Sequence, residues 1–439
     1  MSRPQSIDEV DVFAADTIED WYPTYDLLRQ ECPVYRVPGT DTYFVTRYDD
    51  IITVLRQTDV YRRGDGGTRP LLRDPQAAAY YAEHGWPKRL PLGIDPPKHR
   101  RYREMVDHFF NVAGAEQQRP LIEAIVDRLI DDMAHAAGTG RPVDFLDAFA
   151  VPLPVEVITT MIGFPLADIE QLKRWSEAWV APFSLQLDAE QEREVARLNV
   201  EFQHYIAEHI AQRRVAPTDD VISYLVTTPV RLANGDRPLR DDEIINMIDH
   251  LYIGGNETTT FALASGMWLL IEHPQLQATL RADPMKIPAW VDEVLRLESP
   301  TQGMDRHTAV DAELGGVTIP QGSHVHIRYA AANRDADQFE CPADVDLDRS
   351  NGSRHLAFSL GETHCPGAGL SRLEQVIATT ALLDRFDNLA FADGANDFHH
   401  AVNFTLRAFD ALQITFDDRR PPPTNPQSGA AGPDRPTPR

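Results

Sequence analysis

The residue most able to take part in chemistry is a cysteine in a glycine-containing loop. Cys365 lies in the segment from Phe358 to Gly367, directly before a helical pattern at 370–386. A helix N-terminus and nearby backbone N–H groups favour the thiolate, which is the nucleophilic and metal-binding form of cysteine. The alternatives are an inert buried thiol and a catalytic nucleophile, although no His or Asn partner for a nucleophile can be assigned from the sequence.

A second unusual segment, Gly254 to Thr260, lies in the middle of a helical pattern. Each of its two glycines costs a helix about 1 kcal/mol relative to alanine. Thr258 follows Gly254 by four residues, so its hydroxyl can bond to the Gly254 carbonyl and leave a notch for a small ligand. A close helix–helix crossing explains the glycines equally well. Glu257 favours the ligand site, because a carboxylate among apolar neighbours needs a specific role.

A third segment concentrates positive charge in an acidic chain. Five of the six residues from Lys98 to Arg103 are basic. Asp95 is predicted to cap a helix in which Pro96 takes the first position. His99 and Arg103 then share one face and can bind a carboxylate or phosphate. A solvated basic face is the alternative, but the acidic surroundings favour an anionic ligand or partner.

These residues need a large, mainly helical frame. The pattern from Asp241 to His273 predicts a buried helix of roughly 50 Å. Short β-like stretches occur at Thr42–Val45, Val317–Ile319 and His324–Ile327. With no flexible linker and no internal repeat, the expected fold is mainly α with small β-sheets in a single large domain, residues 1–420. The Pro-rich stretch 421–439 has little to bury and is predicted to be disordered.

Composition excludes several classes of function. Acidic residues outnumber basic ones 67 to 42 in the 439-residue chain, which disfavours nucleic-acid binding. Three scattered cysteines are too few for a disulfide framework, a four-thiolate zinc site or an iron–sulfur cluster. No apolar run is long enough to span a bilayer, and no signal core precedes the first acidic residues. The expectation is a cytoplasmic protein without a membrane span.

Together, the order and spacing of the motifs resemble the cytochrome P450 family, the bacterial haem-thiolate monooxygenases, from about residue 22 to 418. The loop around Cys365 matches F-x-x-G-x-x-x-C-x-G, and the long helix matches G-G-x-E-T-T. Glu293 and Arg296 match E-x-x-R, which is weak by itself because most such pairs are surface ion pairs. The resemblance implies the P450 fold, with the long helix over a haem group.

The resemblance implies a role for each matching residue. Cys365 is the proximal thiolate ligand of the iron in heme b (iron protoporphyrin IX), which favours cleavage of the O–O bond of O2. Glu257 and Thr258 are the acid–alcohol pair that delivers protons. The implied haem-binding residues are His99, Arg103 and Arg306 at the propionates, together with Gly254, Phe358, Gly361 and Gly367.

Three positions depart from the family pattern. Thr363 stands where a His or Arg usually binds a propionate, two residues before the cysteine. Asp344 stands where a third Arg or His usually completes the Glu293–Arg296 brace, and Arg349 or Arg354 is the expected substitute. Pro366 has no N–H to donate toward the sulfur, which predicts a more electron-rich thiolate.

The implied reaction is hydroxylation or oxidative dealkylation of a lipophilic small molecule with O2. Three cysteines cannot build a ferredoxin module, so electrons are expected from an external ferredoxin and an NAD(P)H-dependent ferredoxin reductase. The donor is expected near Lys98, Arg100 and Arg101. The expected apolar lining of the substrate pocket is Tyr80, Tyr81, Trp86, Trp179, Phe183, Met304 and Phe404.

Three alternatives remain open at this point. A haem-thiolate peroxygenase would use peroxide and would not need the pair Glu257 and Thr258, whose presence argues against it. A non-catalytic haem sensor would bind haem without turnover. A haem-free thiol hydrolase would use Cys365 as its nucleophile.

Overall fold

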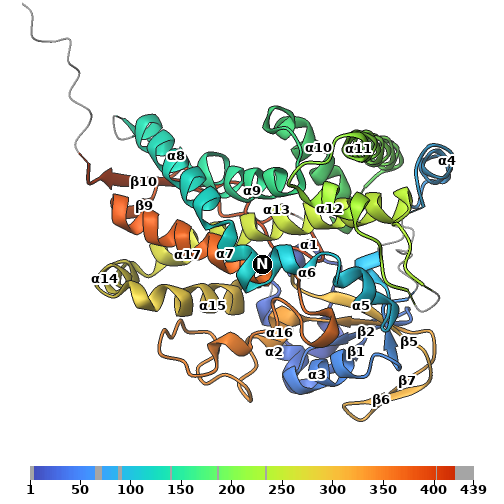
Figure 1. Ribbon diagram of the computed structural model, residues 1–439. Helices are drawn as coiled ribbons and strands as arrows, with labels where there is room; N and C mark the ends of the chain where they lie inside the picture. The colour runs from blue at the N-terminus through green and yellow to red at the C-terminus, as the bar shows by residue number, and fades with distance from the viewer. Residues whose placement is uncertain are drawn as a thin grey trace, which may run out of the picture.

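Helices make up most of the structure, a computed structural model that describes residues 4–64, 72–87, 91–138, 141–184, 187–232, 235–401 and 403–420. They gather around one long helix, α13 (Asp241–Glu272), which crosses the middle of the molecule (Figure 1). The other α-helices among the described residues are α1 (Ala15–Glu19), α2 (Tyr22–Glu31), α3 (Tyr48–Arg56), α4 (Pro75–His84), α5 (Lys98–Arg103), α6 (Asp107–Phe110), α7 (Val112–Gln117), α8 (Arg119–Ala137), α9 (Pro152–Ile162), α10 (Ile169–Val180), α11 (Ala189–Val215), α12 (Val221–Thr227), α14 (Pro274–Ala282), α15 (Ile287–Glu298), α16 (Tyr329–Ala332) and α17 (Ala368–Arg385).

The predicted long central helix is confirmed as α13, which begins at Asp241 and ends one residue before the predicted end. Its first turn holds three acidic residues, which interact favourably with the helix dipole. The Glu243 carboxylate also accepts a hydrogen bond from the Arg240 backbone N–H at 2.8 Å. Pro274 disfavours a helical conformation at the residue before it, and α13 ends there. Most side chains of α13 are buried in the main hydrophobic core, so the helix is a fixed support for its central residues.

The described strands form three small sheets, with orders β1-β2-β8-β5-β3, β4-β10-β9 and β6-β7. The larger sheet lies at one side of the molecule, below α13 in Figure 1. All three predicted strands are confirmed, as β2, β7 and β8. The strands are β1 (Val34–Arg36), β2 (Thr42–Val45), β3 (Tyr61–Arg62), β4 (Val143–Asp144), β5 (Met304–Thr308), β6 (Ala312–Leu314), β7 (Val317–Ile319), β8 (His324–Ile327), β9 (Phe386–Phe391) and β10 (Gln413–Asp418).

The predicted start of the basic helix was wrong. Helix α5 begins at Lys98, and the Asp95 side chain does not cap it. The Asp95 carboxylate instead accepts hydrogen bonds from the backbone N–H groups of Arg63 at 2.7 Å and Gly64 at 3.1 Å. These two amides of a neighbouring loop satisfy both carboxylate oxygens, which a single helix N–H cannot do. The contact fixes Arg63 beside α5.

The fold class predicted from the sequence, mainly α with small β-sheets in one large domain, is confirmed by this arrangement and by the comparisons described below. The proposed division at residue 420 stays a prediction, and the tail 421–439 lies outside the described residues. In the part of the chain that the structure describes, no helix is both long enough and apolar enough to cross a membrane.

Candidate functional site

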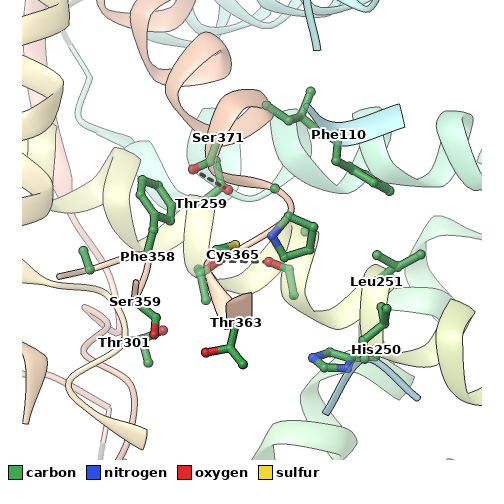
Figure 2. A pocket seen from close by; sticks show the side chains of 18 of the residues that line it. Phe110, His250, Leu251, Thr259, Thr301, Phe358, Ser359, Thr363, Cys365 and Ser371 are labelled. Atoms are coloured by element: carbon green, nitrogen blue, oxygen red, sulfur yellow. Dashed lines mark hydrogen bonds between the residues drawn. The ribbon is translucent and has the colours of Figure 1, made fainter. Parts of the chain in front are cut away.

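A cavity lies between α13 and the loop that carries Cys365, where the resemblance places the haem. Gly254 and Thr258 face it from α13, and Cys365 and Gly367 face it from the loop. Figure 2 shows Cys365 near the centre of this pocket, between Phe358 on one side and Leu251 and His250 on the other. Most of the remaining wall is apolar or aromatic, formed by Leu92, Phe110, Leu295, Met304, Tyr329, Ala357 and Leu370.

The cysteine loop is held in shape by its own backbone. The Cys365 N–H donates a hydrogen bond to the Phe358 carbonyl at 2.9 Å, and the His364 N–H donates to the Gly361 carbonyl at 3.1 Å. Gly361 has φ +73°, a conformation that favours glycine. A Cβ on Gly367 would lie 3.9 Å from the Cys365 sulfur, so its absence leaves the approach to the sulfur open. Gly361 shapes the loop but does not itself line the cavity.

The electrostatics of Cys365 differ from the sequence expectation. Burial raises the pKa of the Cys365 thiol. The N–H groups of Gly367 and Ala368 and the guanidinium groups of Arg103 and Arg372 act in the opposite direction, but burial outweighs them. The N–H groups that the sequence predicted to favour the thiolate do act in that direction, but they do not decide the net shift. A metal ion bound to the sulfur displaces the proton whatever the pKa of the free thiol.

The two glycines of α13 have different surroundings. The predicted bond from the Thr258 hydroxyl to the Gly254 carbonyl is present at 3.0 Å. A Cβ on Gly254 would meet no atom within 4 Å, whereas one on Gly255 would lie 3.0 Å from the Ile158 side chain of α9. Gly254 therefore leaves open space beside the cavity, and Gly255 allows a close helix crossing. Each of the two explanations offered by the sequence applies to one glycine.

Glu257 turns away from the cavity. Its Oε1 accepts a hydrogen bond from the Ser176 hydroxyl of α10 at 2.7 Å, and the residue is absent from the cavity lining. Burial raises the pKa of the Glu257 carboxyl, which the bond from Ser176 only partly offsets. The acid and Thr258 are thus neighbours on α13 with Thr258 on the inner side.

Basic side chains gather at one end of the cavity. His99 and Arg103 line it, and Arg103 pairs with Asp107 and donates a hydrogen bond to the His364 carbonyl of the cysteine loop. Burial lowers the pKa of His99 to about 4, helped by nearby guanidinium groups. Arg306 is 4% exposed and does not itself line the cavity; it donates a hydrogen bond to the Asp305 carbonyl at 2.7 Å.

Arg63 completes this basic end, and the sequence analysis missed it. Its side chain lines the cavity, and the nearby charges of Arg306 and Arg103 add to burial in lowering the pKa of Arg63 to about 10. No local pattern identifies Arg63, because its position depends on the contact with Asp95, 32 residues later. Thr363 also lines the cavity, with a neutral side chain where the family usually has a cation.

A buried acid, Glu374, also lines the cavity and was missed. It is 1% exposed, and its Oε2 has no hydrogen-bond partner among the described residues. Burial raises the pKa of Glu374 well above the usual value. Nearby, the Thr259 hydroxyl donates a hydrogen bond to the Ser371 hydroxyl at 3.0 Å and links α13 to α17 (Figure 2). Among the described residues, Glu374 thus forms no ion pair comparable to that of Arg103 with Asp107.

These residues fit a haem group. The thiol faces a mostly apolar cavity, Gly254 leaves open space opposite it, and cations suited to carboxylates lie at one end. The predicted set Cys365, His99, Arg103, Gly254, Phe358 and Gly367 is brought together around one cavity. Arg306, Gly361 and Glu257 stand just outside it.

The Glu293–Arg296 pair forms a buried brace on α15. Arg296 is 0% exposed and bonds to both Glu293 oxygens at 2.7 and 2.9 Å. Arg349 donates to Glu293 at 3.2 Å, so Arg349 supplies the third member that the sequence assigned to Arg349 or Arg354. Asp344 contributes its backbone carbonyl, which accepts from Arg296 at 2.9 Å.

The side chains expected to line the substrate pocket mostly lie outside this cavity, and their contact with substrate stays a prediction. Of the seven side chains, Met304 alone lines this cavity within the described residues. Phe404 instead packs against Trp21 and Phe44 in the N-terminal core, and the Trp179 indole N–H donates to Asp249 at 3.0 Å. Their aromatic character indicates burial, but it does not show which core they enter.

Comparisons with known proteins agree with this geometry. The family described as "Cytochrome P450" matches residues 30–399. Cytochrome P450 107B1 of Saccharopolyspora erythraea is 34% identical over 403 residues, covering 90% of this chain and 95% of that protein. PikC, a P450 monooxygenase of Streptomyces venezuelae, is 34% identical over an alignment that covers 92% of this chain and 91% of PikC.

Solved structures show the same fold. P450 CREJ in complex with (4-ethylphenyl) dihydrogen phosphate has a TM-score of 0.83 at 28% identity, covering 90% of this chain and 97% of that one. P450BioI in complex with a fatty-acyl carrier protein has a TM-score of 0.80 at 30% identity, covering 92% and 99%.

Proposed function

The chain belongs to the cytochrome P450 family and is a haem-dependent monooxygenase, and from this premise we propose that it hydroxylates or oxidatively dealkylates a lipophilic small molecule with electrons from a separate ferredoxin. One observation carries the proposal. Cys365 lines a mostly apolar cavity that Gly254 and Thr258 line from α13. This lining supports a haem site between the cysteine sulfur and the Thr258 hydroxyl.

The chain's residues supply the binding and proton-handling parts of the reaction. When bound through a thiolate, haem supplies the reductive activation of O2. Cys365 would hold the iron, and His99, Arg103 and Arg306 would bind the propionates. The Thr258 hydroxyl lies at the cavity, where it donates a hydrogen bond to the Gly254 carbonyl, and the Glu257 carboxyl lies on the outer side of α13, where burial raises its pKa. We assign these two residues the proton delivery that the reaction requires.

The walls of the cavity support a lipophilic substrate. Leu92, Leu251, Leu295 and Met304 contribute aliphatic surface, while His250 and Thr301 add polar groups. Relatives include a 6-deoxyerythronolide B hydroxylase, 32% identical, and a mycinamicin IV hydroxylase/epoxidase, 34% identical. Spectral titration with terpenes, steroids, fatty acids and aromatic acids would identify the class. A lipophilic compound is expected to shift the Soret band, whereas a response confined to small hydrophilic compounds would contradict this assignment.

The proposed electron donor is an acidic ferredoxin that docks beside the cysteine loop. Helix α5 carries exposed Lys98 and Arg100 and half-buried Arg101, and Arg103 ties the helix to this loop. Exposed charges of this kind steer association and make its rate depend on salt. The double variant Arg100→Glu/Arg101→Glu is expected to slow reduction and to weaken its salt dependence.

A control for docking is available on α10, which lies on the other side of α13 in Figure 1. Lys173 makes an i,i+4 pair with Glu177, much as Arg100 does with Glu104. Lys173→Glu should leave the reduction rate unchanged. Equal effects of the α5 and α10 variants would contradict docking at α5.

Isotope labelling separates the proposed function from its alternatives. With ferredoxin, reductase, NAD(P)H and 18O2, a monooxygenase places one labelled atom in the product. A peroxygenase would take its label from hydrogen peroxide and would not need the ferredoxin. A sensor would form no product, and a haem-free thiol hydrolase would form product without haem. The expected result is label from 18O2, lost when ferredoxin is omitted.

A further inference from the structure

Two arginines stand beside the cavity, half-buried Arg63 and buried Arg306. Among the described residues, neither Arg63 nor Arg306 forms an ion pair with a carboxylate. The Arg63 guanidinium lies 3.5 Å from the Leu92 carbonyl, and Arg306 bonds to the Asp305 carbonyl. Arg103 differs from them, because Asp107 already neutralises it. The cavity thus has one arginine in its wall and one beside it that lack an ion-pair partner within the described residues, and removing such charges from water is unfavourable without an anion.

The position of Arg63 is fixed by contacts that do not use its charge. The Asp95 charge acts on the Arg63 guanidinium from a distance, but both Asp95 carboxylate oxygens accept hydrogen bonds from the backbone N–H groups of Arg63 and Gly64. The Asp95 N–H returns a bond to the Gly64 carbonyl at 3.3 Å. This clamp holds the backbone while the side chain reaches the cavity. The guanidinium is therefore presented to whatever occupies that space.

The surroundings indicate which part of an occupant Arg63 meets. Arg103, whose charge is close enough to Arg63 to lower its pKa, also donates to the carbonyl of His364, the residue before Cys365. The basic cluster is thus tied to the cysteine loop, beside which a haem held by Cys365 would present its propionates. Arg63 and Arg306, which lack ion-pair partners within the described residues, equal those two carboxylates in number. A carboxylate accepting two N–H bonds from an arginine is a strong and geometrically specific contact.

We propose that Arg63 binds a haem propionate and takes the role that Thr363 cannot fill. The inference rests on the proposed haem site and adds one residue to it. In the family pattern, the cation for this contact stands two residues before the cysteine, and here that position is a neutral threonine. Arg63 brings the missing charge from a different part of the chain. It is a cofactor-binding residue and takes no part in proton delivery.

The test measures haem release from holoprotein to excess apomyoglobin. Arg63→Gln should release haem about 10- to 100-fold faster than the unchanged protein, the range expected for losing a charged hydrogen bond. Arg62→Gln is the matched control, because Arg62 is the exposed neighbour on β3. It should release haem at the unchanged rate. Equal rates for the protein and Arg63→Gln would overturn the proposal.

Repeating the release assay with haem dimethyl ester in place of haem distinguishes loss of a propionate contact from a general loss of structure. Its esterified carboxyls carry no charge, so Arg63→Gln should not accelerate its release. Apoprotein carrying Arg63→Gln should also unfold at the same temperature as unchanged apoprotein or a higher one, because the substitution removes an uncompensated charge. Equal acceleration for haem and for its ester, or a less stable apoprotein, would show that Arg63 is merely structural.

A second variant tests whether the two positions share one role. Thr363→His places a donor at the family's usual position, and in the Arg63→Gln background it should restore slow haem release. If Thr363→His does not restore slow haem release, Arg63 does not replace the propionate-binding residue that the family has at position 363. A failure of the haem site itself is distinguishable, because the unchanged protein would then not retain haem at all. If Arg63 instead binds a substrate carboxylate, Arg63→Gln would weaken binding of acidic compounds without changing haem release.

Discussion

Two groups of buried or half-buried arginines in this molecule have opposite electrostatic surroundings. In the α15 brace, Arg296 meets both oxygens of Glu293 and the carbonyls of Asn333, Pro342 and Asp344. At the basic end of the cavity, Arg63 and Arg306 meet backbone carbonyls and, within the described residues, no carboxylate. The first group is neutralised by the protein itself. The second group has no such partner within the described residues, which supports the proposed binding of an anion there.

The contrast separates structural charge from ligand-binding charge. A buried ion pair with every donor satisfied holds segments together, and removing one partner is costly. A cation without a counter-ion destabilises the empty protein, and binding of an anionic ligand offsets that cost. Burial alone does not distinguish the two, since Arg296 and Arg306 are both below 5% exposed.

The largest expected effect is loss of the brace. Glu293→Gln leaves Arg296 and Arg349 buried without their shared carboxylate and is expected to cost about 3–5 kcal/mol in the free energy of unfolding. Chemical denaturation of the holoprotein measures it. Exposed Glu313, which accepts a bond from Thr318, provides the control Glu313→Gln. A decrease of less than about 1 kcal/mol in the free energy of unfolding would mean that the brace contributes no more than an ordinary surface ion pair.

A pH effect is expected at the basic end of the empty cavity. Burial and the neighbouring arginines lower the pKa of His99 to about 4, against an ordinary value of 6.5. Folded His99 therefore stays neutral, and the unfolded chain takes up the proton first as pH falls. The free energy of unfolding of the apoprotein should therefore fall by roughly 2–3 kcal/mol between pH 6.5 and 4 because of His99 alone. In His99→Gln, the free energy of unfolding should fall by that much less over the same pH range, as measured by chemical denaturation at several pH values. The same dependence of stability on pH in both proteins would contradict this prediction.

The same type of substitution should act differently at Glu257. Its described side-chain partner is the neutral Ser176 hydroxyl, and burial raises the pKa of the carboxyl. Glu257→Gln should therefore change the free energy of unfolding by less than about 1 kcal/mol but slow turnover about 100-fold. Product formation and denaturation, measured side by side, test this. Destabilisation as large as that of Glu293→Gln would mean that Glu257 is structural.

The smallest expected effect concerns the sulfur. Pro366 offers no N–H, but Gly367 and Ala368 still present theirs to Cys365. Pro366→Leu should add one donor to those two, draw electron density from the thiolate and raise the haem reduction potential. Pro366→Ala, which restores the same N–H with a smaller side chain, should shift the potential in the same direction. An unchanged or lowered potential in a redox titration would contradict the prediction.

Local sequence signals predicted the parts of the site that depend on local structure. The bounds of α13 and the Thr258–Gly254 bond follow from helical periodicity and an i,i+4 spacing. The clamp of Asp95 on Arg63 could not be predicted in this way, because it joins segments whose packing no local pattern encodes.

The side-chain directions of Glu257 and Glu374 were equally hidden. A helical pattern shows that a residue is on a helix, but its direction depends on which neighbours pack around the helix. The choice of Arg349 over Arg354 likewise depends on how the chain returns to α15.

The central claim is that the Cys365 sulfur binds the haem iron. The absorption spectrum of the reduced, carbon monoxide-bound protein tests it most directly, because thiolate-ligated haem has a strongly red-shifted Soret band. The account predicts this band in the unchanged protein and its loss in Cys365→His, which keeps an iron ligand without a thiolate. A red-shifted band that survives the substitution, or haem-supplemented protein that stays colourless, would contradict the account.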